Sequence, residues 1–179
     1  MAEHDSRAFT LWELLWTLSV LGTVMAIGAP SMLEFLQASR QTADVNGFVA
    51  AVQLARSEAA KRGAAIVVCK SADRRTCAGE ELRYDSGWIV FENTDDARPP
   101  ARGVDEPLIF AYEPVSRGAI TSNRRLFEFR AYGWRSTNGT VTFCDASGRA
   151  RAVIVSYTGR PRIADVGPGG RPLICAELP

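Results

Sequence analysis

Residues 8–14 read Ala-Phe-Thr-Leu-Trp-Glu-Leu and begin an apolar run that continues to Ala29. The run from Phe9 to Ala29 contains one charged residue, Glu13. A helix over this run, with a rise of about 1.5 Å per residue, is roughly 32 Å long and can cross a bilayer. A carboxylate near the membrane centre costs about 2.5–3.5 kcal/mol, so we expect a chain that keeps one to supply a partner for it.

Three other interpretations of this segment compete. A secretory signal has an apolar region of about 7–15 residues, whereas this run is longer, contains Glu13 and is followed by Pro30. A plain membrane anchor would let Glu13 reach the interface, and a core helix would bury the run inside a domain. The charge inside the run favours a functional membrane segment, because intramembrane charges usually mark functional sites.

The polar leader followed by Phe-Thr-Leu-x-Glu-Leu resembles the amino-terminal signal of type IV pilins and type II secretion pseudopilins. The resemblance implies that a prepilin peptidase cleaves between Ala8 and Phe9 and methylates the new amine. It also implies that Glu13 pairs with the terminal amine of a neighbouring subunit during assembly. The chain departs from the family pattern at Ala8, where glycine is usual, and at Trp12, where an aliphatic residue is usual.

The rest of the chain changes from a helical pattern to strands. An amphipathic stripe with helical spacing comprises Val45, Phe48, Val49, Val52, Ala55 and Ala59. Lys61-Arg62-Gly63 is a typical helix end. Strands are expected at the apolar runs 65–69, 88–91, 108–112, 126–129, 140–144 and 152–157. A helix followed only by strands predicts an α+β fold with packed antiparallel sheets.

The head sequence narrows the resemblance. Val-Val-Cys69, Ser-Gly-Trp-Ile-Val-Phe91, Phe129-Arg-Ala-Tyr-Gly133, Gly139-Thr-Val-Thr-Phe143 and Ile154-Val-Ser-Tyr-Thr-Gly-Arg160 follow the order seen in the GspH/FimT family of minor pilins and minor pseudopilins. The resemblance covers nearly the whole chain. It implies a type IV pilin-like fold, in which a long N-terminal helix packs on an antiparallel β-sheet head. The expected parts are a leader (1–8), a transmembrane helix segment (9–29), an amphipathic continuation of the helix (30–63) and a β-rich periplasmic head (64–179).

Four cysteines follow the membrane-targeting segment, which predicts disulfides in an oxidising periplasm. Cys69 and Cys77 bracket a short polar loop, so a local bridge is natural, and Cys144–Cys175 would then tie the C-terminal tail to a strand. Three pairings are possible in principle. A zinc site is disfavoured, because no CxxC pair occurs and the single histidine, His4, lies in the predicted leader.

Catalysis is not expected. A mature chain without histidine lacks a Ser-His or Cys-His nucleophile pair, and no glycine-rich phosphate loop occurs in the sequence. We therefore predict no catalytic residue, no cofactor and no metal.

The charge is distributed unevenly. Residues 73–114 carry five arginines and ten acidic residues, whereas residues 115–179 carry ten arginines and four acidic residues. Two motifs, Gly148-Arg-Ala-Arg151 and Gly159-Arg-Pro-Arg162, place arginines one residue apart, so that in an extended segment both can contact phosphates. The second motif resembles the Gly-Arg-x-Arg motif of DNA-binding FimT-type minor pilins, and a salt-bridged loop is the alternative. The DNA-binding candidates are Arg160, Arg162, Arg149, Arg151, Arg124 and Arg125.

The resemblance implies a minor pilin of a type IV pilus that helps prime or cap pilus assembly, with double-stranded DNA as a candidate ligand through phosphate contacts. The expected partners are other pilins or pseudopilins, the prepilin peptidase and the inner membrane. The expected location is the bacterial inner membrane, crossed once, with the periplasmic head reaching a pilus tip or pseudopilus after assembly. One alternative is minor pseudopilin H of a type II secretion system. A second is a membrane-anchored periplasmic binding protein.

Overall fold

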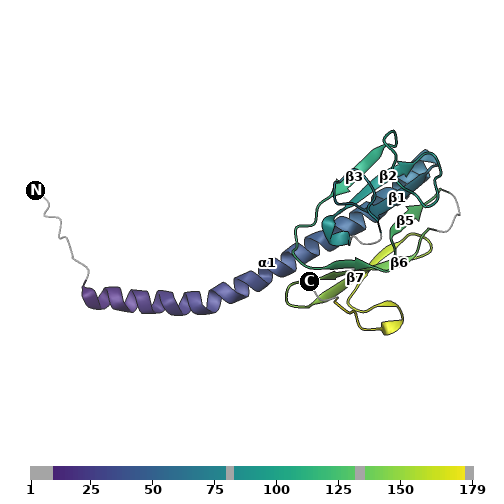
Figure 1. The fold of residues 1–179 in the computed structure, drawn as a ribbon. Coiled ribbons are helices and arrows are strands. Elements are labelled where there is room, and N and C mark those ends of the chain that lie inside the picture. The colour runs from purple at the N-terminus through teal and green to yellow at the C-terminus, as the bar shows by residue number, and fades with distance from the viewer. Residues whose placement is uncertain (1–9, 80–82, 132–135, 176–179) are drawn as a thin grey trace, which may run out of the picture. The chain divides into compact units, whose positions relative to one another are not determined.

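The computed structural model describes residues 10–79, 83–131 and 136–175 (Figure 1). A single long helix, α1 (Leu11–Arg62), begins the described chain and strands follow it. The strands are β1 (Ala65–Lys70), β2 (Trp88–Asn93), β3 (Leu108–Tyr112), β4 (Ile120–Ser122), β5 (Leu126–Phe129), β6 (Gly139–Cys144), β7 (Ala150–Val155) and β8 (Pro161–Ala164). Two short 3-10 helices, η1 (Tyr84–Ser86) and η2 (Pro168–Gly170), precede β2 and follow β8. The chain divides into two compact units, Met1–Leu36 and Gln37–Pro179.

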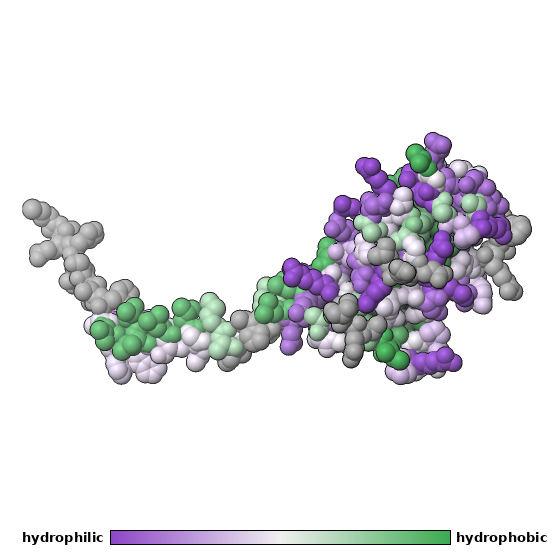
Figure 2. Space-filling view, in the orientation of Figure 1, coloured by the Kyte–Doolittle hydropathy of each residue, from purple (hydrophilic) through white to green (hydrophobic). Residues whose placement is uncertain are grey.

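The first unit contains the apolar part of α1. Its large apolar side chains are exposed and colour this part of the helix green in Figure 2. By length and composition, α1 is the one helix in the described part of the chain that can cross a membrane. The hydroxyls of Thr17, Ser19 and Thr23 donate to backbone carbonyls three or four residues earlier. These polar groups are therefore satisfied inside the helix, as an apolar surrounding requires.

The second unit is a head built from two four-stranded antiparallel sheets, with strand orders β3-β2-β1-β5 and β4-β6-β7-β8. The second half of α1 lies along these sheets (Figure 1) and is buried on one face, where Val45, Phe48, Val52 and Ala55 have no exposed surface. This arrangement confirms the predicted α+β fold, in which a long N-terminal helix packs on antiparallel sheets. The stripe expected from helical spacing is the face that packs on the sheets, with Val49 half-buried at its margin.

Phe48 joins the two sheets through its aromatic ring. The ring meets those of Tyr84, Trp88 and Phe127 nearly edge-on, at centroid distances of 5.8, 5.5 and 5.7 Å. On the other sheet it meets Phe143 of β6 at 6.1 Å. Such aromatic pairs contribute about 0.5–1.5 kcal/mol each beyond the buried area. One helix residue therefore anchors the core that both sheets share.

A buried polar side chain, Gln41, fixes α1 to the second sheet. Its amide nitrogen Nε2 donates to the backbone carbonyl of Phe143 at 2.9 Å and to that of Arg149 at 3.0 Å. The two carbonyls flank the turn between β6 and β7. Because a buried amide without partners is costly, these bonds specify where the turn sits on the helix.

Both disulfides are present in the structure. Cys69–Cys77 closes the loop after β1, on the face of the first sheet that lies away from α1. There a second apolar cluster contains Val67, Ile89 and Phe91. Cys144–Cys175 links the end of β6 to the C-terminal segment. The second bridge therefore holds the segment that follows β8 against the sheet that carries both Gly-Arg-x-Arg motifs.

Candidate functional sites on the helix and the head

The start of α1 is a reciprocal hydrogen-bonded cap. The Glu13 carboxylate accepts hydrogen bonds from the Thr10 backbone N–H at 3.0 Å and from the Thr10 hydroxyl at 2.9 Å. In return, the Glu13 N–H donates to Thr10 Oγ1 at 3.3 Å. This is a capping box, which satisfies donors that an α-helix leaves free at its first turn. The expected cleavage and methylation site, Ala8 and Phe9, lies outside the described residues.

Glu13 is exposed in the isolated chain, and Thr10 holds its carboxylate at the positive end of the helix dipole. The carboxylate is therefore held in place and open to a partner. The sequence analysis missed the role of Thr10 in orienting Glu13. The signal for it is the Thr-x-x-Glu spacing, which is typical of a capping box.

The glycine of the second Gly-Arg-x-Arg motif shapes the turn between β7 and β8. Gly159 has a φ of 69°, and its N–H donates to the Ser156 carbonyl at 2.8 Å. A Cβ at Gly159 would lie 2.8 Å from Ser136 Oγ and 3.1 Å from Phe129 Cδ1. Both the left-handed backbone and the close packing require glycine here.

Arg160 and Arg162 leave this turn along β8, the edge strand of the second sheet. Arg160 immediately precedes β8, and Arg162 lies opposite Ile154 of β7. Both side chains are exposed. Among the described residues, neither guanidinium has an ion pair or a hydrogen bond. Two unpaired cations thus lie two residues apart on an exposed edge.

The upstream arginines have acidic partners. Arg149 Nε lies 2.9 Å from Asp145 Oδ2, and Arg151 Nε lies 3.6 Å from Asp165 Oδ1. Burial raises the pKa of Asp145, but hydrogen bonds from Ser147 and Arg149 outweigh this effect and leave that pKa below its ordinary value. Arg149 and Arg151 therefore form salt bridges, which is the alternative to DNA binding for a Gly-Arg-x-Arg motif.

Sheet register separates the two arginine pairs. Along β7, Arg151 shares a face with Val153 and Val155, whereas Ile154 points to the other face. Arg162 is the partner of Ile154 and shares its face. The two pairs therefore lie on opposite faces of the sheet and at opposite ends of β7, so they do not form one surface.

Arg124 and Arg125 follow β4 at the end of the sheet where β8 begins. The exposed Arg124 donates from Nε to the Asn138 carbonyl at 2.9 Å. A Cβ at Gly139 would lie 2.6 Å from Arg124 Cγ, and Gly139 shares the face of its partner Val155. Arg124 therefore lies over the face of the sheet opposite to Arg162, the partner of Ile154. Arg125 is half-buried, its carbonyl accepts a hydrogen bond from Tyr84, and its Nε is buried without a partner in the described part of the chain. Arg160 and Arg162 are therefore the unpaired cations at this edge, and Arg124 is not part of their surface.

The described residues contain no group of three or more histidine, cysteine or acidic side chains that could hold a metal ion. All four cysteines are paired in disulfides.

Comparisons with known proteins agree with this fold. Two crystal structures of the type IV minor pilin FimU from Pseudomonas aeruginosa are similar to the chain. One gives a TM-score of 0.54 at 15% identity over 75% of this chain and 99% of FimU. The other gives 0.53 at 16% identity over 79% and 99%. A search of curated proteins gave no match. The family model for the type II transport protein GspH matches residues 44–159, more than half of the sequence, and the chain therefore belongs to this family of type IV pilin-like proteins.

Proposed function

We propose that the chain is a minor pilin that helps prime or cap the assembly of a type IV pilus. Members of its family are pilin-like structural proteins, and the fold implies assembly with other pilins or pseudopilins. The observation that carries the proposal is the contrast in side-chain exposure between the two halves of α1. Leu14, Leu18 and Val24 are 55%, 56% and 61% exposed, whereas the helix face that packs on the head is fully buried.

An exposed apolar helix of this length needs cover along its whole surface. Before assembly the inner membrane supplies this cover, with residues 9–29 as a single pass and the head in the periplasm. During assembly, apolar helices of other subunits replace the lipid. The satisfied hydroxyls of Thr17, Ser19 and Thr23 suit both environments.

The proposed processing creates the partner for Glu13. Cleavage by the prepilin peptidase between Ala8 and Phe9 gives each subunit a new terminal amine, which is then methylated. The Glu13 carboxylate, oriented by Thr10, accepts the amine of a neighbouring subunit. An ion pair between subunits removes much of the cost of keeping a carboxylate in an apolar surrounding.

Substitution of Glu13 tests the proposal. A Glu13→Ala chain should reach the membrane in normal amounts and disappear from the sheared filament fraction, measured by immunoblotting against the membrane fraction. Glu34→Ala is the matched control, since Glu34 is an exposed acid on the same helix and should be dispensable. Thr10→Ala separates capping from pairing, because it removes the cap but keeps the carboxylate. Normal incorporation of Glu13→Ala would reduce Glu13 to a helix cap.

Double-stranded DNA is the second proposed partner, bound by Arg160 and Arg162. The specific observation is that Arg160 and Arg162 lack acidic partners among the described residues, in contrast to Arg149 and Arg151. Unpaired guanidiniums bind phosphates without first breaking an ion pair. Binding of a short DNA duplex by the full chain in detergent, with and without Arg160 and Arg162, tests this role.

A pseudopilin of a type II secretion system is the alternative function. The observation in its favour is the description of the matching family, type II transport protein GspH. Deletion of the gene separates the two functions. Loss of surface pili with normal release of secreted proteins supports the pilus role, and retention of pili with secreted proteins trapped in the periplasm supports the secretion role.

A further inference from the structure

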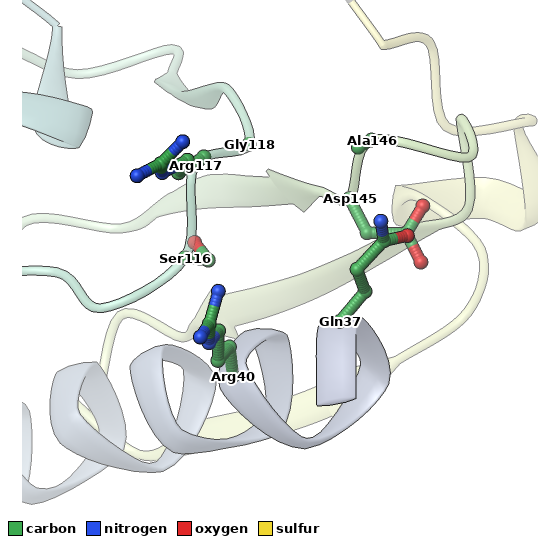
Figure 3. A pocket seen from close by; sticks show the side chains of 7 residues that line it. All are labelled: Gln37, Arg40, Ser116, Arg117, Gly118, Asp145 and Ala146. Carbon is green, nitrogen blue, oxygen red and sulfur yellow. The ribbon is translucent and has the colours of Figure 1, made fainter. Parts of the chain in front are cut away.

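A small pocket lies in the head where three segments meet (Figure 3). Its volume is about 100 Å³. Its walls come from α1, from the segment that precedes β4 and from the turn between β6 and β7. The lining residues are Gln37, Arg40, Ser116, Arg117, Gly118, Asp145 and Ala146.

The wall formed by Ser116–Gly118 is held firmly. The Ser116 N–H donates to the Asp44 carboxylate of α1 at 2.9 Å. A Cβ at Gly118 would lie 1.6 Å from the Cys144 carbonyl oxygen, so only glycine lets this segment lie against the end of β6. The Cys144 N–H donates to the Ala119 carbonyl at 2.9 Å. The pocket is therefore preformed rather than assembled by a ligand.

The pocket carries two unpaired cations. In Figure 3 the Arg40 guanidinium rises from α1 toward Ser116, and Arg117 lies on the same side of the pocket. Both side chains are exposed, and neither has an ion pair or hydrogen bond among the residues that the structure describes. Because neither guanidinium is already paired, an anion at the pocket can bind to either one without first breaking an ion pair.

The acid in the lining, Asp145, is not that anion. It is 5% exposed and lies on the opposite side of the pocket from the arginines (Figure 3). Its Oδ1 accepts hydrogen bonds from the Ser147 N–H, the Ser147 hydroxyl and the Arg149 N–H. Its Oδ2 accepts one from Arg149 Nε. Asp145 is thus already neutralised by Arg149.

We infer that the pocket receives an aspartate or glutamate side chain from a neighbouring pilin-like subunit. The inference rests on the proposed function, because it requires assembly. The size fits, because a water needs about 10–15 Å³ of such volume and the pocket therefore has room for a carboxylate group. The planar guanidinium matches a carboxylate with two parallel hydrogen bonds. Arg40 follows Leu36, the last residue of the exposed apolar stretch, by four positions. The pocket therefore begins just after the stretch of α1 that other subunits would cover.

Photo-crosslinking in the native host tests the inference with the full chain. Ala146 lines the pocket and is exposed, so p-benzoylphenylalanine at this position probes the pocket and keeps both arginines. We expect a crosslink to another pilin-like subunit, at a peptide that contains aspartate or glutamate. Arg40→Gln with Arg117→Gln should reduce this crosslink about tenfold, as expected for loss of a charge pair at an interface. Arg75→Gln with Arg171→Gln is the matched control and should leave the crosslink unchanged, because both arginines are exposed and lie outside the pocket.

A second probe at Leu21 on the apolar segment separates this inference from the proposed function. A Leu21 crosslink to a subunit without an Ala146 crosslink overturns the pocket inference and leaves the assembly role intact. An Ala146 crosslink that survives the double substitution, or one that joins a phospholipid, overturns it as well. Absence of both crosslinks overturns the assembly role and the inference together. A charge swap supports the pocket inference: Arg40→Glu with Arg117→Glu should lose the crosslink, and an acid-to-arginine change in the partner should restore it.

Discussion

The Asp44 carboxylate of α1 accepts a hydrogen bond from the Tyr112 hydroxyl of β3 at 3.1 Å. Asp44 has no exposed surface, and it also accepts two backbone N–H groups from the segment after β3. The Tyr112 ring stacks on Trp88, with ring centroids 4.4 Å apart, and lies where a Cβ at Gly47 would approach within 2.6 Å. Helix, strand and following segment therefore meet at one buried carboxylate.

Removal of the Asp44 carboxylate should destabilise the head. Asp44→Ala leaves the backbone N–H groups of Val115 and Ser116 without their acceptor, which we expect to cost about 3 kcal/mol, whereas the Tyr112 hydroxyl can still donate to the Ala43 carbonyl. Asp105→Ala is the control and should stay within about 0.5 kcal/mol, because Asp105 is exposed. Denaturant unfolding of the full chain in detergent, followed by near-UV circular dichroism, measures both changes. Equal unfolding midpoints for the two variants would contradict the role of Asp44.

The Tyr112 phenol should titrate late. Burial, together with the charge and hydrogen bond of Asp44, raises the pKa of Tyr112 to about 12. Because the pKa is higher in the folded state, the stabilisation from this phenol is complete below pH 10 or so, the ordinary tyrosine pKa, and is lost as the pH rises toward 12. The ultraviolet titration of the wild type minus that of Tyr112→Phe isolates this group. Asp44→Ala should shift its midpoint to lower pH, and an unchanged midpoint would remove Asp44 as a cause.

The helix and strands whose sequences show a regular apolar pattern could be predicted from the sequence. The α1 stripe and the longer strands follow from residue spacing, because burial of one face imposes a period of 3.6 or 2. The strands β4 and β8 were not predicted, since each contains a single large apolar residue, whereas the equally short β5 contains three and was predicted. Consecutive strands β4 and β5 enter different sheets, which no local pattern specifies.

The candidate sites also depend on contacts that no local sequence pattern specifies. Gln41 and Asp44 bind backbone groups that lie about 70 to 110 positions later in the chain, so a helical pattern cannot distinguish them from exposed polar residues. The two Gly-Arg-x-Arg motifs look alike in sequence. Their difference depends on Asp145 and Asp165, which the fold brings to Arg149 and Arg151 and not to Arg160 and Arg162. Pairing of charges is a tertiary property that spacing along the chain does not contain.

The two disulfides should differ in their contributions to stability. The cysteines are 8 positions apart in Cys69–Cys77 and 31 in Cys144–Cys175. In the chain-entropy account, the longer loop gives about 1 kcal/mol more stabilisation. Paired Cys→Ala variants, one pair for each bridge, allow this comparison by equilibrium unfolding. A larger loss for the 69–77 variant would show that packing around Cys69, rather than loop length, dominates.

The mature chain should begin at Phe9. The Ala8-Phe9-Thr10-Leu11-x-Glu13 pattern beside an apolar segment motivates this expectation. Intact-mass measurement of chain extracted from membranes should show loss of residues 1–8 and the addition of one methyl group. A chain that retains Met1, or one cleaved near Ala29, would instead support an uncut anchor or a secretory signal.

DNA binding should depend on the unpaired arginines and not on the paired ones. Phosphate neutralisation releases counterions, so the affinity of the full chain for any duplex should fall steeply with salt. Changing Arg160 and Arg162 to glutamine should weaken binding for every sequence and reduce the slope of log K against log salt by about 2, because each side chain neutralises one phosphate. Arg124→Gln should leave the slope nearly unchanged, because Arg124 lies over the face of the sheet opposite to Arg162.

Arg149 and Arg151, which are paired with acids, supply the matched control for this DNA-binding prediction. Arg149→Gln with Arg151→Gln removes the same charge from the same sheet, but on the opposite face and from within ion pairs. This variant should bind DNA as the wild type does, with an unchanged salt slope measured by fluorescence anisotropy. If both double variants weaken binding equally, the chain's net charge rather than the Arg160–Arg162 pair attracts DNA. If neither does, the second Gly-Arg-x-Arg motif serves only to form the turn that Gly159 requires.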